Sequence, residues 1–170
     1  MENDRKERVF SMLRGIDRPG MDTVIERLES YGYFDAMCYG HHHYRGGVVD
    51  HSLEVYDYMM EHAGSGIPRD SIVIAALFHD LGKAVRKGTR FGYAEHPGRS
   101  LAVLDECCLV LTEDERKAIR MHHQWKSLQA MASFVACPLR ALLTKGDCDS
   151  TGKWKAAHPK TSHKQRKATR

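Results

Sequence analysis

The chain of 170 residues lacks any long apolar run. Its most apolar stretch, residues 72–78, is far shorter than the roughly 18 to 20 residues that cross a bilayer, so we expect no membrane-spanning segment and no membrane partner. The charged residues 1–8 lead into no apolar stretch or small-residue cleavage site of the kind a secretory signal needs. We therefore expect a cytoplasmic protein.

The chain also lacks Cys-x-x-Cys pairs and phosphate-cradling glycine patterns. Its five cysteines are an odd number, and a chain of this length forms a core without disulfide bonds, so we expect reduced thiols. The glycines between residues 86 and 92 fit neither the Walker nor the dinucleotide-binding pattern, so no ATP site is expected.

The composition is that of one globular domain, with 42% hydrophobic and 28% charged residues. The net charge of +4 is unevenly placed, because seven Lys or Arg residues and no acid follow residue 152. We expect a helical lead-in over residues 1–40, a core over residues 41–150 and a basic, flexible tail over residues 151–170. Such a tail either binds single-stranded nucleic acid through counterion release or is merely solvated. The oligomeric state stays open.

Apolar residues recur at helical spacing along most of the chain, and nothing alternates with the period of two that a strand requires. Residues 71–81 are apolar enough to lie at the centre of the fold, with Asp70 as N-cap and Gly82 as the helix stop. Thr112 and Glu115 have the spacing of a capping box, and Pro138 opens the last core helix. The predicted helices are 22–31, 48–60, 71–81, 97–111, 112–123, 128–135 and 138–147, with a loop over 83–93. The predicted fold class is therefore all-α, a compact helical bundle.

Five of these core segments carry His or Asp residues at an end: His51, His79-Asp80, His96, His122-His123 and Asp147. An imidazole beside a carboxylate at the inner end of a buried helix costs several kcal/mol if unpaired, and a cation satisfies both groups. Nitrogen and oxygen ligands without a thiolate suit Mn, Fe, Ni, Co, Zn or Mg and do not decide among these metals. Two such ions about 3.5–4 Å apart lower the pKa of a bridging water and clamp phosphate oxygens for in-line attack.

These residues also carry a family resemblance. Residues 46–53 (GGVVDHSL), residues 75–83 (AALFHDLGK), His96, the His122-His123 pair and Asp147 resemble the H…HD…H…H…D series of the HD superfamily of metal-dependent phosphohydrolases. The likeness covers roughly residues 41–149. Within the superfamily, residues 41–47 (HHHYRGG) are similar to the HD domains of bacterial 3′–5′ exoribonucleases.

The resemblance implies two divalent metal ions. His51, His79, Asp80 and Asp147 hold the first, and His96 and His122 hold the second, with Asp80 bridging the two. His123 is an alternative to His122, because adjacent helical side chains diverge by about 100° and the sequence does not say which points inward. Asp149 is the alternative to Asp147.

We therefore expect hydrolysis of a phosphoester of a nucleotide or nucleic acid by a metal-activated hydroxide, with Asp80 and Lys83 as the catalytic residues. Lys83 follows Asp80 by three residues, which suits it to stabilise charge on phosphoryl oxygens. The predicted substrate-binding residues are Lys83, Arg45, His42 and Arg99, with Arg86, Arg90, Tyr44 and Tyr93 as weaker candidates. Two alternatives remain, a di-iron oxygenase of the HD type with the same six ligands and a non-catalytic nucleic-acid-binding module.

Overall fold

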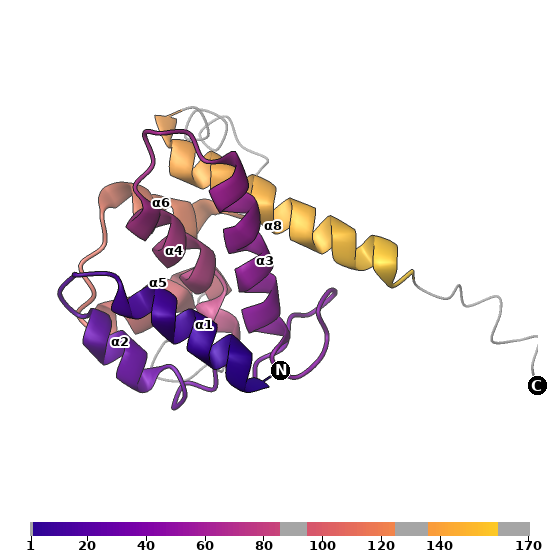
Figure 1. The fold of residues 1–170 in the computed structure, drawn as a ribbon, viewed down its shortest axis with the longest axis horizontal. Coiled ribbons are helices and arrows are strands. Elements are labelled where there is room, and N and C mark those ends of the chain that lie inside the picture. The colour runs from indigo at the N-terminus through magenta and orange to yellow at the C-terminus, as the bar shows by residue number, and fades with distance from the viewer. Residues whose placement is uncertain (1, 86–94, 125–135, 160–170) are drawn as a thin grey trace, which may run out of the picture.

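The computed structural model describes residues 2–85, 95–124 and 136–159, which form helices and no strand (Figure 1). The α-helices are α1 (Glu2–Arg14), α2 (Met21–Arg27), α3 (Gly47–His62), α4 (Arg69–Phe78), α5 (His96–Glu106), α6 (Glu113–Met121) and α8 (Pro138–Ala157), and a 3₁₀ helix, η1, spans Leu81–Lys83. The predicted all-α fold class is confirmed.

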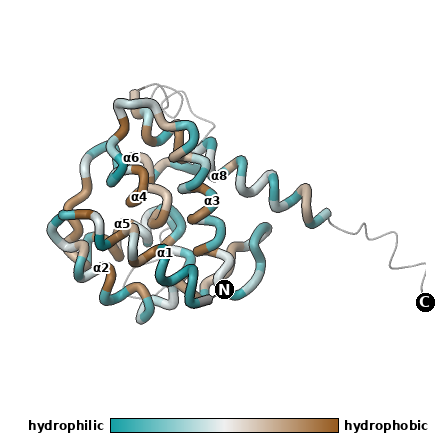
Figure 2. Tube along the Cα trace, viewed as in Figure 1, coloured by the Kyte–Doolittle hydropathy of each residue, from teal (hydrophilic) through white to brown (hydrophobic). Residues whose placement is uncertain are grey.

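Helix α4 is the centre of the bundle. Every residue from Ser71 to Phe78 is buried, and the helix packs against α3, α6 and α8. Figure 2 shows the hydrophobic residues of α4 enclosed among the other helices. The two residues that follow α4, His79 and Asp80, are buried as well.

The start of α4 differs from the prediction. Pro68, not Asp70, is the N-cap, and its extended backbone (φ −61°, ψ 139°) leads into a helix that begins at Arg69. Proline has no N–H and takes this conformation readily, so the chain turns into the helix there. Asp70 lies in the first turn, where a carboxylate favours the positive end of the helix dipole.

The end of α4 also differs. Gly82 is not the stop, because the helix ends at Phe78 with His79 as C-cap, and Asp80 (φ −104°, ψ 4°) turns the chain into η1. Gly82 has a different role, which is to permit a close approach. A Cβ atom there would lie 2.1 Å from the carbonyl oxygen of His96, so only glycine lets η1 lie directly on the start of α5.

Helix α5 ends at Glu106, five residues before the expected end. Cys108 adopts a left-handed conformation (φ 55°), and the N–H of Leu109 donates to the carbonyl of Leu104 at 3.0 Å, a C-terminal closure typical of helices. The sequence did not reveal this, because residues 109–111 continue the apolar pattern.

The N-terminal region, predicted as a helical lead-in over residues 1–40, holds α1 and α2, and only the bounds of the second helix were predicted. The charged segment of α1 was not recognised, although Val9 and Leu13 share its inner face and are fully buried. Helix α2 ends at Arg27, four residues before the predicted end at residue 31.

The capping box at the start of α6 is confirmed, since Thr112 and Glu115 exchange both hydrogen bonds. Glu115 is fully buried, and its carboxylate also accepts from Ser71 of α4 at 2.6 Å and pairs with Arg18 at 2.5 Å. These bonds fix the orientation of α6 relative to α4. Helix α6 ends at Met121, so His122 is its C-cap.

Pro138 opens the last helix as predicted, but α8 continues ten residues beyond Asp147 to Ala157, so part of the predicted tail is helical. Figure 1 shows this half of α8 extending away from the bundle. The predicted helix 128–135, residues 86–93 of the predicted loop and residues 160–170 of the tail lie outside the described residues. All five cysteines are free thiols. Among the described helices, none combines the length and the apolar character that a bilayer crossing needs.

Candidate metal centre

The first group of candidate ligands meets at the inner end of α4. Nε2 of His51, from α3, lies 3.1 Å from Oδ1 of Asp147, from α8, and 3.3 Å from Nε2 of His79. Oδ2 of Asp80 lies 3.6 Å and 3.5 Å from these two imidazole nitrogens. All four side chains are buried. The ligand atoms of His51, His79 and Asp80 lie close enough together to share one ion, and Asp147 joins this group through its contact with His51. These residues come from three separate parts of the chain.

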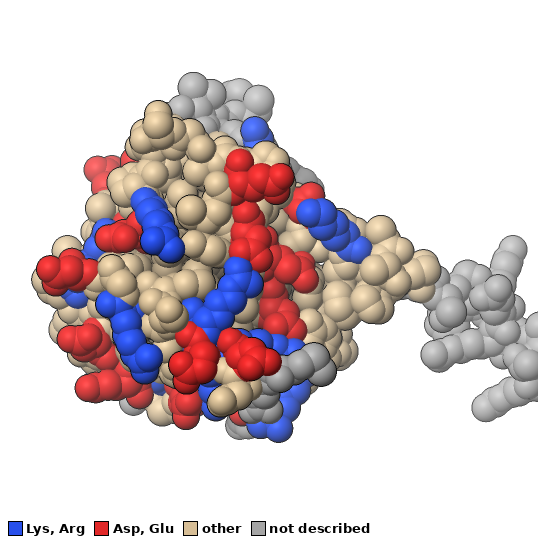
Figure 3. All heavy atoms as spheres, viewed as in Figure 1, with Lys and Arg blue, Asp and Glu red and all other residues tan. Residues whose placement is uncertain are grey.

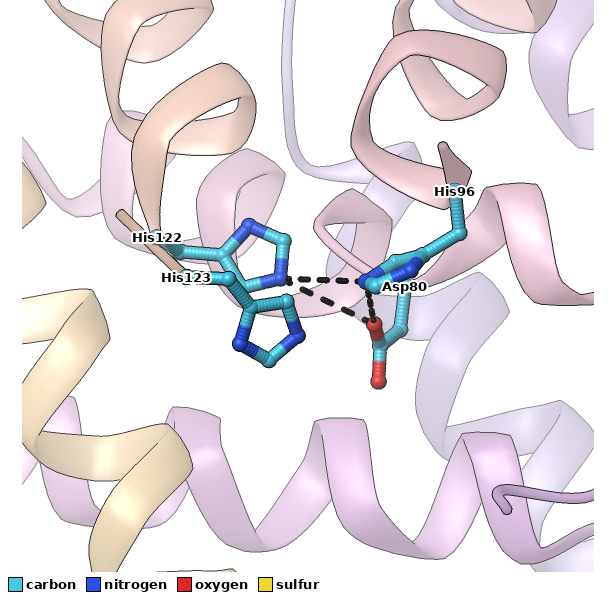
Figure 4. A group of neighbouring side chains, drawn as sticks. All are labelled: Asp80, His96, His122 and His123. Atoms are coloured by element: carbon cyan, nitrogen blue, oxygen red, sulfur yellow. Dashed lines mark hydrogen bonds and ion pairs between the residues drawn. The ribbon is translucent and has the colours of Figure 1, made fainter. Parts of the chain in front are cut away.

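The second group meets the other oxygen of the same aspartate. Nε2 of His96, the first residue of α5, lies 3.1 Å from Oδ1 of Asp80, and Nε2 of His122, the C-cap of α6, lies 3.8 Å from it (Figure 4). The two nitrogens are 3.4 Å apart. Asp80 therefore directs Oδ2 to one group and Oδ1 to the other, so one carboxylate contacts both groups.

The two alternative ligands lie differently. His123 is half-exposed and lies beside His122 (Figure 4). Its Nδ1 is 3.7 Å from Oδ2 of Asp147. It lies close enough to Asp80, His96 and His122 to join the second group. Asp149 pairs with Lys153 at 2.6 Å, away from the cluster. The structure thus brings Asp147 to the cluster and leaves Asp149 outside it.

Hydrogen bonds to the backbone locate the protons of two imidazoles. Nδ1 of His79 is 2.9 Å from the carbonyl oxygen of Ala76, and Nδ1 of His122 is 2.7 Å from that of Ile119. A carbonyl oxygen only accepts, so each Nδ1 carries a proton and each Nε2 presents a lone pair. Both lone pairs face Asp80.

Burial and local charge place His79, His122 and Asp80 in the protonation states that bind metal. Burial lowers the pKa of His79 to about 4 and holds the pKa of His122 well below its usual value, so both rings are neutral. Burial alone would raise the pKa of Asp80, but His79 and Lys83 outweigh it and hold that pKa well below its usual value. Neutral imidazoles and an ionised carboxylate are the ligand forms that a metal requires.

A divalent cation fits these residues. Oδ1 of Asp80 is buried and forms no well-aligned hydrogen bond with the described residues, although Nε2 of His96 lies 3.1 Å from it and the lone pair of His122 also faces it. Acceptors that converge without a shared proton repel one another, and a buried carboxylate oxygen without a partner is costly. A cation between them removes both penalties, and the nitrogen and oxygen donors suit the divalent metals named above.

A cavity of about 640 Å³ opens onto the cluster. Its wall includes His96 and Asp147, and two cations predicted for substrate binding, Lys83 and Arg99. Nζ of Lys83 lies 2.5 Å from Oδ2 of Asp80, and Nε of Arg99 donates to the carbonyl of Gly82 at 3.0 Å. Both positive charges are therefore held beside the candidate ligands.

The structure does not bring Arg45 or His42 to this cavity. Nε of Arg45 donates to Asp35 at 2.8 Å on the exposed surface. His42 is 1% exposed and stacks on Trp154, with 4.5 Å between the ring centroids. Its backbone lies directly against Gly47 at the start of α3. His41, not His42, lines the cavity. Tyr44 donates to Asp50 at 2.7 Å. Arg86, Arg90 and Tyr93 lie outside the described residues.

Two residues that the sequence did not single out bond to the backbone at and around His122. Arg140 is buried and donates to the carbonyl of Gln124 at 2.6 Å, and Thr144 donates to the carbonyl of His122 at 3.4 Å. Both come from α8. The one available signal was an arginine inside the otherwise apolar run of residues 139–143.

Comparison with known families agrees with this geometry. The model of the HD domain matches residues 48–162, more than half of the chain. This chain belongs to the HD domain family. The family implies a metal-dependent phosphohydrolase that binds divalent metals. No curated protein and no solved structure matched the chain, and nothing supports the narrower likeness to exoribonucleases.

Proposed function

We propose that this HD-domain protein hydrolyses a phosphoester of a nucleotide or nucleic acid with two divalent metal ions. The observation that carries the proposal is that the two carboxylate oxygens of Asp80 face different groups of candidate ligands. One oxygen faces His51 and His79, with Asp147 in contact with His51, and the other faces His96 and His122. When bound, a pair of ions supplies an acidified water and neutralises charge on phosphoryl oxygens.

The protein's own residues supply the rest of the site. Asp80 contacts both ligand groups from a fixed position, because it is buried where the chain turns from α4 into η1. Lys83 and Arg99 place two positive charges in the cavity wall, where they stabilise the charge that develops on a phosphoryl group in the transition state. The side chain of Lys83 is only 13% exposed, so water screens its charge less than on a free surface.

The cavity is large enough for a nucleotide. Its volume of about 640 Å³ lies in the range of roughly 300–1,000 Å³ that small-molecule sites occupy. Beyond the ligands, the wall presents the exposed ring of Tyr39 and the exposed cation Lys155. An aromatic face and several cations around a metal cluster suit a phosphate with a base attached.

The test is hydrolysis of phosphomonoesters and phosphodiesters by the purified protein with Mn²⁺ or Ni²⁺. We expect Asp80→Asn, which keeps the shape of the side chain and removes its charge, to lose both metal content and activity. Wild-type activity in this variant, or stoichiometric metal without hydrolysis of any nucleotide or oligonucleotide substrate, would refute the proposal. Anaerobic purification with iron quantification and a spectrum tests the di-iron alternative, since hydrolysis by iron-free protein excludes a requirement for iron.

A further inference from the structure

His51 differs from the other candidate ligands in how its outer nitrogen is held. His79 and His122 stand at helix ends, where carbonyl groups of the last turn lack helical partners and accept from Nδ1. His51 lies inside α3, where the helix uses its own carbonyls. Its Nδ1 instead lies 2.9 Å from Oγ of Ser150, on α8. A hydroxyl both donates and accepts, so Ser150 alone does not fix the proton on His51.

Glu54 removes this ambiguity. Its Oε2 lies 2.6 Å from Oγ of Ser150, and a carboxylate only accepts, so the hydroxyl proton of Ser150 points to Glu54. The hydroxyl oxygen is then left to accept from Nδ1–H of His51. The lone pair of His51 consequently lies on Nε2, the atom that faces His79, Asp80 and Asp147.

Glu54 is itself held in the ionised form. Nε2 of His42 lies 3.2 Å from both of its oxygens, and the ring of His42 is fixed by stacking on Trp154. Burial alone would raise the pKa of Glu54, but the hydrogen bonds from His42 and Ser150 outweigh it and lower that pKa. His42 therefore serves the cluster indirectly, through a carboxylate.

We propose that Glu54 is a positioning residue which, through Ser150, keeps the proton of His51 on Nδ1 and so prepares Nε2 to bind metal. The proposal rests on the proposed function only in that it takes the His/Asp cluster as a metal centre. Outer hydrogen-bond partners of this kind orient a ligating imidazole and raise its basicity.

The position of Glu54 separates this role from substrate binding. Glu54 and Ser150 do not line the cavity over the cluster; they line a different hollow of about 470 Å³, together with Asp57, Glu61 and Asp149. Figure 3 shows acidic side chains gathered along α3 on this face. Glu61 lies on the same helix and in the same hollow, and within the described part of the chain it has no contact with His51 or Ser150. It is the matched control.

The experiment compares full-length wild type, Glu54→Gln, Ser150→Ala, their double variant and Glu61→Gln, stripped of metal. Dissociation constants for Zn²⁺ and Mn²⁺ are measured by competition with a chelator. The tautomer of His51 is read from nitrogen chemical shifts of its ring by NMR, and thermal unfolding verifies folding. We expect about tenfold weaker metal binding or more in both single variants. The double variant should lose no more metal affinity than whichever single variant binds metal more weakly, because Glu54 and Ser150 act on His51 through the same hydrogen-bond path. Glu61→Gln should match wild type.

The NMR signal distinguishes positioning from a merely structural role. We expect His51 to carry its proton on Nδ1 in wild type and Glu61→Gln, and on a mixture of Nδ1 and Nε2 in Glu54→Gln and Ser150→Ala. Unchanged metal affinity and unchanged tautomer in folded Glu54→Gln would overturn the proposal, as would a proton on Nε2 in wild type.

The two proposals fail separately. If Glu54 controls metal affinity but no phosphoester is hydrolysed, the proposed function fails and the positioning role of Glu54 stands. If wild type hydrolyses phosphoesters but Glu54→Gln leaves both the metal affinity and the tautomer of His51 unchanged, the positioning role fails and the proposed function stands.

Discussion

Replacement of Gly82 by alanine tests whether the close approach of η1 to α5 builds the second ligand group. The added Cβ would lie 2.1 Å from the carbonyl oxygen of His96 and 2.7 Å from the backbone nitrogen of Ser100. Both neighbours are backbone atoms, so the contact is relieved only if η1 and α5 separate by about 1 Å. That movement also strains the bonds from Gly82 N–H to Ser100 Oγ, 2.7 Å, and from Arg99 to the Gly82 carbonyl, 3.0 Å.

The cost follows from these contacts. Overpacking of a tight site costs about 1–3 kcal/mol, and one weakened hydrogen bond adds about 1 kcal/mol. In a domain of this size each kcal/mol lowers the melting temperature by about 2–4 °C, so we expect Gly82→Ala to melt roughly 5–15 °C lower. Because Asp80 and His96 lie on the two sides that separate, the Mn²⁺ or Zn²⁺ affinity should also fall at least about tenfold.

The assay is thermal unfolding with and without Zn²⁺, together with a metal titration. Gly152→Ala is the matched control, because this helical glycine of α8 is exposed and a Cβ there would meet nothing within 4 Å. We expect it to stabilise the protein by up to about 1 kcal/mol and to leave metal affinity unchanged. If Gly82→Ala melts and binds metal like wild type, the argument that this glycine sets the geometry of the site is wrong.

Two further predictions concern single side chains. Lys83→Met should retain metal but lose about 10²-fold in kcat, because a charge beside the phosphoryl group is removed while the ligands remain. An equal loss of metal content would show instead that Lys83 holds Asp80 in place. Asp147→Asn should weaken metal binding at least about tenfold whereas Asp149→Asn should not, and atomic absorption of the two purified variants decides between them.

The sequence predicted the elements that have strong local signals. The period of apolar residues located α3 and the buried α4, and Thr112 with Glu115 located the start of α6. The prediction from sequence failed where contacts between distant parts of the chain decide the bounds of a helix. α5 ends early because Cys108 turns left-handed, and α1 was missed because its few apolar residues gain their burial only from packing against the rest of the fold.

The candidate site shows the same division. Residue types at helix ends were enough to collect the candidate ligands, because imidazoles and carboxylates at the ends of apolar helices need partners. The resemblance to the HD superfamily then implied which six of them bind metal, and the structure places these six in contact with one another. Spacing did not separate Asp147 from Asp149, which lie two residues apart on α8 and face different sides. It also misplaced His42 and Arg45, because their partners Glu54 and Asp35 are set by the fold.

The placement of ligands at helix ends has a physical reason that the hydrogen bonds make explicit. A helix leaves its last carbonyl groups without helical partners, and a histidine at the C-cap satisfies one of them through Nδ1, as His79 does with Ala76 and His122 with Ile119. The bond that completes the helix thereby fixes the tautomer that leaves Nε2 free for metal. A ligand inside a helix has no free carbonyl to use, so His51 requires side chains for the same task. At the ends of α4 and α6, backbone carbonyls are therefore enough to hold Nδ1 of His79 and His122. In α3, His51 needs Ser150 and Glu54 for the same purpose.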